Sequence, residues 1–150
     1  MNQRRLSAGR PVNGVFVAYP FEDRTQSIVD GTIGPALLSQ GFECMTARSY
    51  VGHRAVDAVR CSIENSVGVI GIALGKNPNV FFELGVASGL RKPCILLVES
   101  NADAAMLHGA YPVISTQSSN SSLFNELAAH IRRWRRPSAS NIDLMHGHFA

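Results

Sequence analysis

Short apolar runs without alternation are separated along the chain by longer segments in which apolar residues recur at helical spacing. Continuous apolar runs bounded by turn residues are typical of strands that are covered on both faces. We therefore predict strands at 14–19, 42–45, 67–74, 94–98 and 111–115. Because Pro112 cannot donate a hydrogen bond to a neighbouring strand, the last of these is expected at an edge of the sheet.

The helical spacing predicts helices at 25–40, 54–65, 77–91 and 121–134, with a short helix at 101–108. The third helix has a favourable start, since Asn77 is a good N-cap and Pro78 suits the first helical position. Gly31, Gly34 and Pro35 are expected to weaken or kink the first helix.

Apolar character assigns further residues to the core. They are Val56, Val59, Cys61 and Ile63 in the second predicted helix, Phe81 and Phe82 in the third, and the other cysteines, Cys44 and Cys94. One of the two phenylalanines is also a candidate for stacking on a ligand. Three cysteines within apolar stretches do not suit the disulfide framework of a secreted protein and favour a reducing compartment. We expect a cytoplasmic protein.

Strands that alternate with helices predict an α/β fold, a three-layer sandwich with a mostly parallel sheet of the flavodoxin-like or Rossmann-like class. A chain of 150 residues with 45% apolar residues is enough for one such domain. We place this domain at 13–136, after a disordered basic N-terminus at 1–12 and before a flexible C-terminal tail at 137–150.

The formal net charge of +3 is not evidence for nucleic-acid binding, because half of the 14 basic residues lie at 1–12 and 132–136. Between residues 13 and 130 acidic side chains outnumber basic ones, so the body of the domain has no basic stripe. The N-terminal arginines are not followed by an apolar run, and neither a signal peptide nor a membrane span is predicted. We expect neither nucleic acid nor a membrane as a partner.

Glu83 is the one acidic residue between positions 65 and 98. On a helix with about 100° per residue it falls beside Val86, Ala87 and Leu90, on an apolar side. A carboxylate in such surroundings loses hydration, which raises its pKa unless a cation or hydrogen bonds favour the charged form. Residues of this kind are candidates for functional sites.

The fold class predicts where a ligand would bind. In open parallel sheets ligands lie beyond the carboxyl ends of the strands, which selects the loops at 19–25, 46–53 and 74–79. Glu83 lies roughly 7.5 Å along its helix, and helical side chains lean toward the N-terminus, so its carboxylate can reach these loops. The alternative is a structural glutamate paired with Arg48, Arg54 or Lys76.

Two motifs resemble those of a known superfamily. They are Val15-Phe16-Val17-Ala18-Tyr19-Pro20-Phe21 and, further on, Asn77-Pro78-Asn79-Val80-Phe81-Phe82-Glu83-Leu84-Gly85-Val86-Ala87. Together they resemble TIR-like nucleotide-binding domains and the related nucleoside 2-deoxyribosyltransferases, over residues 14–99. The second motif is the more specific. Relatives often read Asp-Leu-Thr-Gly before it, where this chain has Ile72-Ala73-Leu74-Gly75.

The resemblance implies chemistry at an N-glycosidic bond, with Glu83 as the catalytic residue. A carboxylate beside the anomeric carbon stabilises an oxocarbenium-like state or forms a glycosyl intermediate, and this needs no metal. The implied substrate-binding residues are Tyr19, Pro20, Phe21 and Asp23 in the first loop and Ser49 and Tyr50 in the second. Asn77 and Asn79 are further candidates, because a helix N-terminus attracts anions, although capping alone explains Asn77.

Three functions remain open at this point. The leading hypothesis is a TIR-like hydrolase or cyclase that cleaves the N-glycosidic bond of NAD or a related nucleotide, with NAD as substrate rather than cofactor. A role in an assembly as a bacterial antiphage effector belongs to the same hypothesis. The second is a nucleoside 2-deoxyribosyltransferase, and the third is a non-catalytic nucleotide-sensing or protein-interaction domain. The resemblance implies a homo-oligomer or assembly with a regulatory partner. A phosphate-binding Walker loop and a dinucleotide glycine fingerprint are both missing, and His146 and His148 are assigned to the tail rather than to a metal site.

Overall fold

The computed structural model describes residues 13–47, 55–75, 77–100 and 111–134. The elements in chain order are β1 (Gly14–Ala18), α1 (Asp23–Ile28), the π-helical segment η1 (Val29–Ile33), α2 (Gly34–Ser39), β2 (Glu43–Thr46), α3 (Ala55–Glu64), β3 (Gly68–Ala73), α4 (Pro78–Gly89), β4 (Cys94–Val98), β5 (Val113–Ser115) and α5 (Asn120–Arg132). The short helix predicted at 101–108, the N-terminus at 1–12 and the tail at 137–150 lie outside the described residues.

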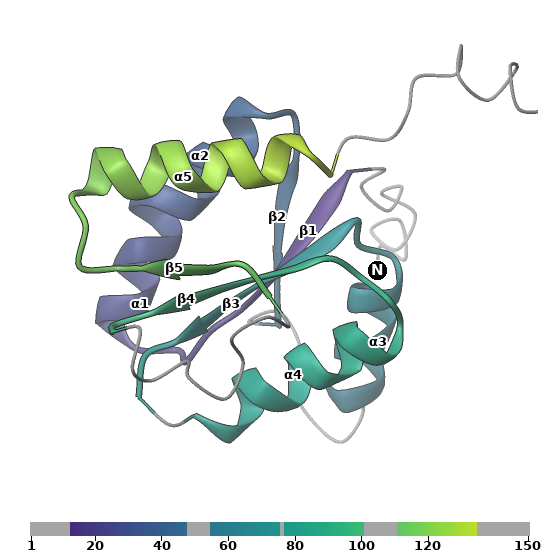
Figure 1. Cartoon of the computed structure of the whole chain (residues 1–150). Helices are drawn as coiled ribbons and strands as arrows, with labels where there is room; N and C mark the ends of the chain where they lie inside the picture. Colours follow the sequence, from purple (N-terminus) through teal and green to yellow (C-terminus); the bar gives the residue numbers. More distant parts are fainter. Residues whose placement is uncertain (1–12, 48–54, 76, 101–110, 135–150) are drawn as a thin grey trace, which may run out of the picture.

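The strands form one five-stranded sheet in the order β2-β1-β3-β4-β5, and every neighbouring pair is parallel (Figure 1). This is the strand order of flavodoxin-like folds, in which the direction of winding reverses between β1 and β3. The predicted α/β class is confirmed. The strand predicted at 111–115 is shorter than expected and forms the edge beyond β4.

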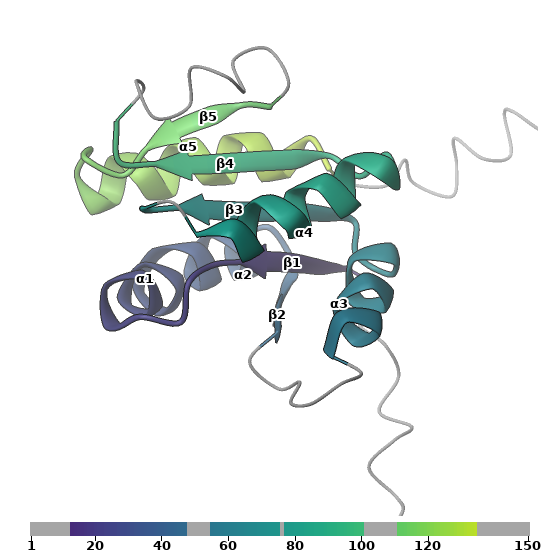
Figure 2. The same ribbon diagram turned by 90° about the horizontal axis from the view of Figure 1, so that it is seen from below.

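Helices cover both faces of the sheet, which gives the predicted three layers (Figures 1 and 2). On one face, α1, η1, α2 and α5 pack on strand residues such as Val15, Ile70 and Leu97. On the other, α3 and α4 pack on residues such as Phe16 and Leu96. The strand runs lack polar alternation because both faces of each central strand are buried.

The first helix begins earlier than predicted, at Asp23, and continues through a π-helical turn to Ser39. The backbone N–H of Gly34 donates to the carbonyl of Val29, five residues earlier. Pro35 has no N–H group, and in an α-helix its ring would clash with the carbonyl four residues earlier. The wider π turn before Pro35 accommodates this ring, so the expected kink takes the form of a π turn.

Several core assignments in α3 are wrong. Val59 and Ile63 are buried as predicted, but Val56 is 60% exposed and Cys61 is also exposed, while Ser62 is buried instead. Helix α3 packs on α4 and β1 through a narrower face than apolar character selected, and this face contains Val59, Ser62 and Ile63.

The aromatic pair of α4 was also assigned wrongly to the core. The helix buries Val80, Leu84 and Ala87 against the sheet, at the spacing of one helical face. Phe81 and Phe82 point in other directions and are 39% and 56% exposed. Of the two remaining cysteines, Cys94 is buried as expected, whereas Cys44 lies exposed on the edge strand β2.

No helix in the described ranges is long and apolar enough to cross a membrane. Within the same ranges, no three His, Cys, Asp or Glu side chains come together as a potential metal site. The histidines of the tail, His146 and His148, lie outside the described residues.

Candidate active site

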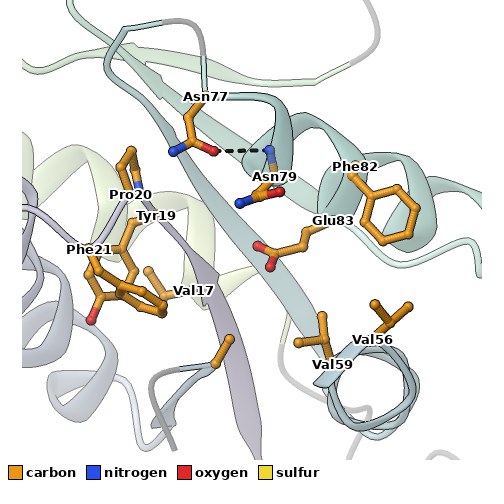
Figure 3. Close-up of a pocket in the computed structure, with 11 residues that line it drawn as sticks. Val17, Tyr19, Pro20, Phe21, Val56, Val59, Asn77, Asn79, Phe82 and Glu83 are labelled. Carbon is orange, nitrogen blue, oxygen red and sulfur yellow. Dashed lines mark hydrogen bonds between the residues drawn. The ribbon is translucent and has the colours of Figure 1, made fainter. Parts of the chain in front are cut away.

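A cavity of about 270 Å³ opens at the carboxyl ends of β1 and β3, where the winding of the sheet reverses (Figure 3). Its walls come from the β1–α1 loop, from α3 and from the first turns of α4. The lining residues are Val17, Tyr19, Pro20, Phe21, Ala47, Val56, Val59, Asn77, Asn79, Phe82 and Glu83. A pocket at this place is what the topology of an open parallel sheet predicts.

Glu83 projects from α4 into this cavity, toward the β1–α1 loop and α3 (Figure 3). It is half-buried, and among the described residues its carboxylate has no hydrogen bond and no ion pair. Burial raises its pKa to about 7, because a charged carboxylate loses hydration there. The cations that a structural role would require, Arg48, Arg54 and Lys76, lie outside the described residues.

The wall opposite Glu83 is the loop that follows β1. The hydroxyl of Tyr19 donates a 2.7 Å hydrogen bond to Oε1 of Gln26 in α1, which fixes the buried phenol ring. The rings of Tyr19 and Phe21 meet edge to face, with centroids 5.0 Å apart. The carbonyl of Pro20 accepts hydrogen bonds from the Thr25 hydroxyl and from the Glu22 backbone N–H. The loop therefore holds an aromatic wall in a defined position.

The start of α4 forms the third side of the cavity. Oδ1 of Asn77 accepts a 2.9 Å hydrogen bond from the backbone N–H of Asn79, so Asn77 is the N-cap that the sequence predicts. The side chain of Asn79 is exposed and lies beside Glu83 in the close-up (Figure 3). Its amide is available to a ligand that approaches the carboxylate.

The remaining wall is apolar; its two valines were predicted for the core, and Phe82 was considered both for the core and for stacking on a ligand. Val56 and Val59 of α3 lie below Glu83, and Phe82 flanks it on α4 (Figure 3). Val56 and Phe82 are largely exposed because they line the open cavity rather than the core. The sequence signal was their apolar character, but periodicity does not distinguish a side chain in the core from one in a pocket.

The structure brings together six of the nine predicted site residues. They are Tyr19, Pro20, Phe21, Asn77, Asn79 and Glu83. Asp23 is exposed in the first turn of α1 and does not line the cavity. Ser49 and Tyr50 lie outside the described residues, although Ala47, just before them, does line the cavity. The roles of all nine residues in binding or catalysis stay predictions.

This arrangement places one acid group among described lining residues that are otherwise uncharged. Glu83 is the one charged side chain among the described residues of the lining. A half-buried carboxylate interacts more strongly with positive charge on a ligand than a fully solvated one does, because the effective dielectric constant around it is lower than in bulk water. The aromatic wall opposite offers flat apolar surface to a ring system.

No family model matches the chain, and no curated protein matches it. Solved structures of other proteins do share its fold. One is a CMP N-glycosidase, BcmB, from Clostridium botulinum, with a TM-score of 0.63 and 19% identity over 79% of this chain and 99% of the other.

Two further structures have the same fold. A 2-deoxyribosyltransferase from Bacillus psychrosaccharolyticus has a TM-score of 0.59 and 15% identity, over 75% of this chain and 90% of the other. BlsM has a TM-score of 0.63 and 18% identity, over 86% of this chain and 98% of the other. The chain thus has the fold of these proteins across nearly their whole length.

Proposed function

We propose that the protein cleaves the N-glycosidic bond of a nucleoside or nucleotide, with Glu83 as the catalytic carboxylate. The observation that carries this proposal is the half-buried Glu83, which has no partner among the described residues and faces an aromatic wall across a cavity at the carboxyl edge of the sheet.

The chemistry follows from where charge develops. When the bond between the sugar and the base breaks, the electron pair leaves with the base and the sugar becomes an oxocarbenium-like cation. The Glu83 carboxylate lowers the energy of this state by electrostatic stabilisation, or attacks the anomeric carbon to form a glycosyl ester. Water then takes the sugar in a hydrolase, and a second base takes it in a transferase.

Two of the structural neighbours support a reaction at this bond. The Clostridium botulinum protein is named as a CMP N-glycosidase and the Bacillus psychrosaccharolyticus protein as a 2-deoxyribosyltransferase, and both names describe chemistry between a sugar and a base. The TIR-like resemblance of the motif around Glu83 supports NAD as the substrate.

The size of the cavity bears on the substrate. Ligand pockets usually measure about 300 to 1,000 Å³, and this one is smaller, at about 270 Å³. It suits one sugar with its base, so the rest of a dinucleotide would lie outside. NAD carries its positive charge on the nicotinamide ring and transfers it to the sugar as the bond breaks, which the Glu83 carboxylate favours. A deoxynucleoside fits the same volume and is the second candidate.

The test is product analysis by chromatography. Full-length protein is incubated with NAD, with CMP, and with a deoxynucleoside plus a second free base, each at low and high protein concentration. Release of nicotinamide or cytosine identifies a hydrolase, and exchange of bases identifies a transferase. Either activity must be lost in Glu83→Gln. If a nucleotide binds but no base is released at any protein concentration, the protein is a sensing domain and the proposal is wrong.

A further inference from the structure

A second cavity of about 500 Å³ lies at the opposite edge of the sheet, where the strands begin. Figures 1 and 2 show that α4 and α5 both end on this side. The cavity is lined by the end of α4, the start of β4, the residues before β5, and Trp134 just after α5. It shares no lining residue with the cavity around Glu83.

Two neighbouring cations, Arg91 and Lys92, face this cavity. The Nζ atom of Lys92 donates a 2.9 Å hydrogen bond to the backbone carbonyl of Ser66, which fixes the ammonium group. Among the described residues neither cation forms an ion pair with a carboxylate. In the part of the chain that the structure describes, the positive charge that faces this cavity is therefore not compensated by a carboxylate.

The backbone of Arg91 is unusual, with a φ of 57°. Its N–H donates to the carbonyl of Ser88, and the N–H of Lys92 donates to that of Ala87, so Arg91 closes the C-terminus of α4. Glycine is the usual residue in this left-handed position, because it adopts positive φ without steric strain. A helix C-terminus favours a cation nearby but does not require one at this strained residue. Arginine at position 91 therefore provides a guanidinium group at the end of α4, which glycine would not provide.

Aromatic surface lies next to the two cations. The ring of Trp134 lies so close to Gly68, the first residue of β3, that a Cβ atom there would be 2.6 Å from it. Tyr111 lines the same cavity and its hydroxyl is hydrogen-bonded to that of Ser88. Glycine at position 68 therefore lets the indole ring lie against the sheet beside the cations.

We propose that this second cavity binds a mononucleotide, with the phosphate at Arg91 and Lys92 and the base against Trp134. An arginine fork binds phosphate oxygens through paired charge-assisted hydrogen bonds, and a free ammonium proton of Lys92 adds a point charge. A nucleobase stacks on an aromatic face. A mononucleotide carries a phosphate and a base a short distance apart, whereas inorganic phosphate lacks the base and a nucleoside lacks the phosphate. The site would bind nucleotide without cleaving it.

The chain has one tryptophan, Trp134, so its fluorescence reports on this cavity and not on the one around Glu83. Full-length Glu83→Gln, which excludes turnover, is titrated with AMP, CMP, adenosine and inorganic phosphate. We expect a saturable change in Trp134 fluorescence with a mononucleotide, at an affinity at least about tenfold higher than with adenosine or phosphate. Equal affinity for inorganic phosphate would overturn the nucleotide proposal.

Arg91→Gly, introduced into the Glu83→Gln protein, tests whether the Arg91 side chain is needed for binding without disturbing the fold. Glycine suits the positive φ, so the melting temperature should stay the same or rise, while mononucleotide affinity should fall by about tenfold or more. Arg133→Ala is the matched control, because Arg133 is exposed just after α5 and does not line the cavity. Unchanged affinity in Arg91→Gly, or nucleotide binding seen by calorimetry without any change in Trp134 fluorescence, would show that this cavity is not the site.

Discussion

Gly71 of β3 lies so close to Leu84 of α4 that a Cβ atom on Gly71 would be 2.9 Å from Cδ1 of Leu84. Leu84 is 2% exposed and belongs to the row of α4 residues that packs on the sheet. Glu83 is its neighbour in the chain, so the close packing of Leu84 on β3 helps to position the helix backbone from which the Glu83 carboxylate projects.

We therefore expect Gly71→Ala to be destabilising. The added methyl group forces Leu84 to shift within a packed core, which costs roughly 1 to 3 kcal/mol, more than the gain of about 0.5 to 1 kcal/mol from replacing a strand glycine. Gly85→Ala is the control, since no atom lies within 4 Å of its added Cβ. Denaturant unfolding of both variants measures the effect, and equal stabilities would disprove the close contact.

Glu83→Gln should lower turnover by two or more orders of magnitude, about 2.7 kcal/mol in the activation free energy. The amide keeps the shape of the side chain but cannot stabilise a cation by charge or act as a nucleophile. Folding should not suffer, because the folded state disfavours the charge of Glu83. If Glu83 were instead part of a structural ion pair, Glu83→Gln should lower the melting temperature, and activity should fall only as far as the folded fraction falls. Kinetics and thermal unfolding on the same samples separate the two.

The pKa of Glu83 also predicts how stability depends on pH. Burial raises it from 4.5 to about 7, so between these values the folded state holds the proton more tightly than the unfolded state. The contribution of Glu83 to the free energy of unfolding is therefore fully present below pH 4.5, falls as pH rises to about 7, and is constant above. The free energy of unfolding of wild type and of Glu83→Gln is measured across this range. The difference between the two proteins should not change with pH if the carboxyl group is not desolvated.

Activity should have the opposite dependence on pH. If the ionised carboxylate stabilises the oxocarbenium-like state, kcat/KM, which reports ionisations of the free enzyme, should rise with pH and level off above about 7, the value to which burial raises the pKa of Glu83. A profile that falls through this range would instead indicate that the protonated acid donates to the leaving base. The control is an assay of stability at each pH, so that unfolding does not distort the rates.

Asn77 combines a structural role with a predicted binding role, and two substitutions separate them. Asn77→Ala removes the acceptor for the Asn79 N–H and should cost about 1 kcal/mol of stability. Asn77→Ser keeps a capping oxygen and should retain stability, but it lacks the amide. A raised KM in the stable Ser variant would assign Asn77 to substrate binding, whereas wild-type kinetics would limit it to capping.

Much of the fold could be predicted because its signals are local. The apolar runs and the cap at Asn77 fixed strands and helices to within a few residues, and the parallel topology placed Glu83 at the carboxyl edge of the sheet. The π turn before Pro35 could not be predicted, since the sequence showed a disturbance of the helix but not how the backbone would relieve it.

The apolar half of the site was missed for a different reason. Val56 and Phe82 look like core residues in the sequence, but in the structure they are exposed and line the cavity. Which apolar side chains of a helix are covered is decided by tertiary packing, which periodicity alone does not give. The isolation of Glu83, by contrast, is visible in the sequence, and among the described residues of the cavity lining it is the one charged side chain.

The lengths of the two edge strands affect how the protein behaves at high concentration. β2 has four residues and β5 has three, so each outer edge offers few backbone groups to a strand from another molecule. Short edges are one of the means by which natural sheets avoid edge-to-edge aggregation. Contacts between copies of this chain are therefore expected to form through side chains and helices rather than by extension of the sheet.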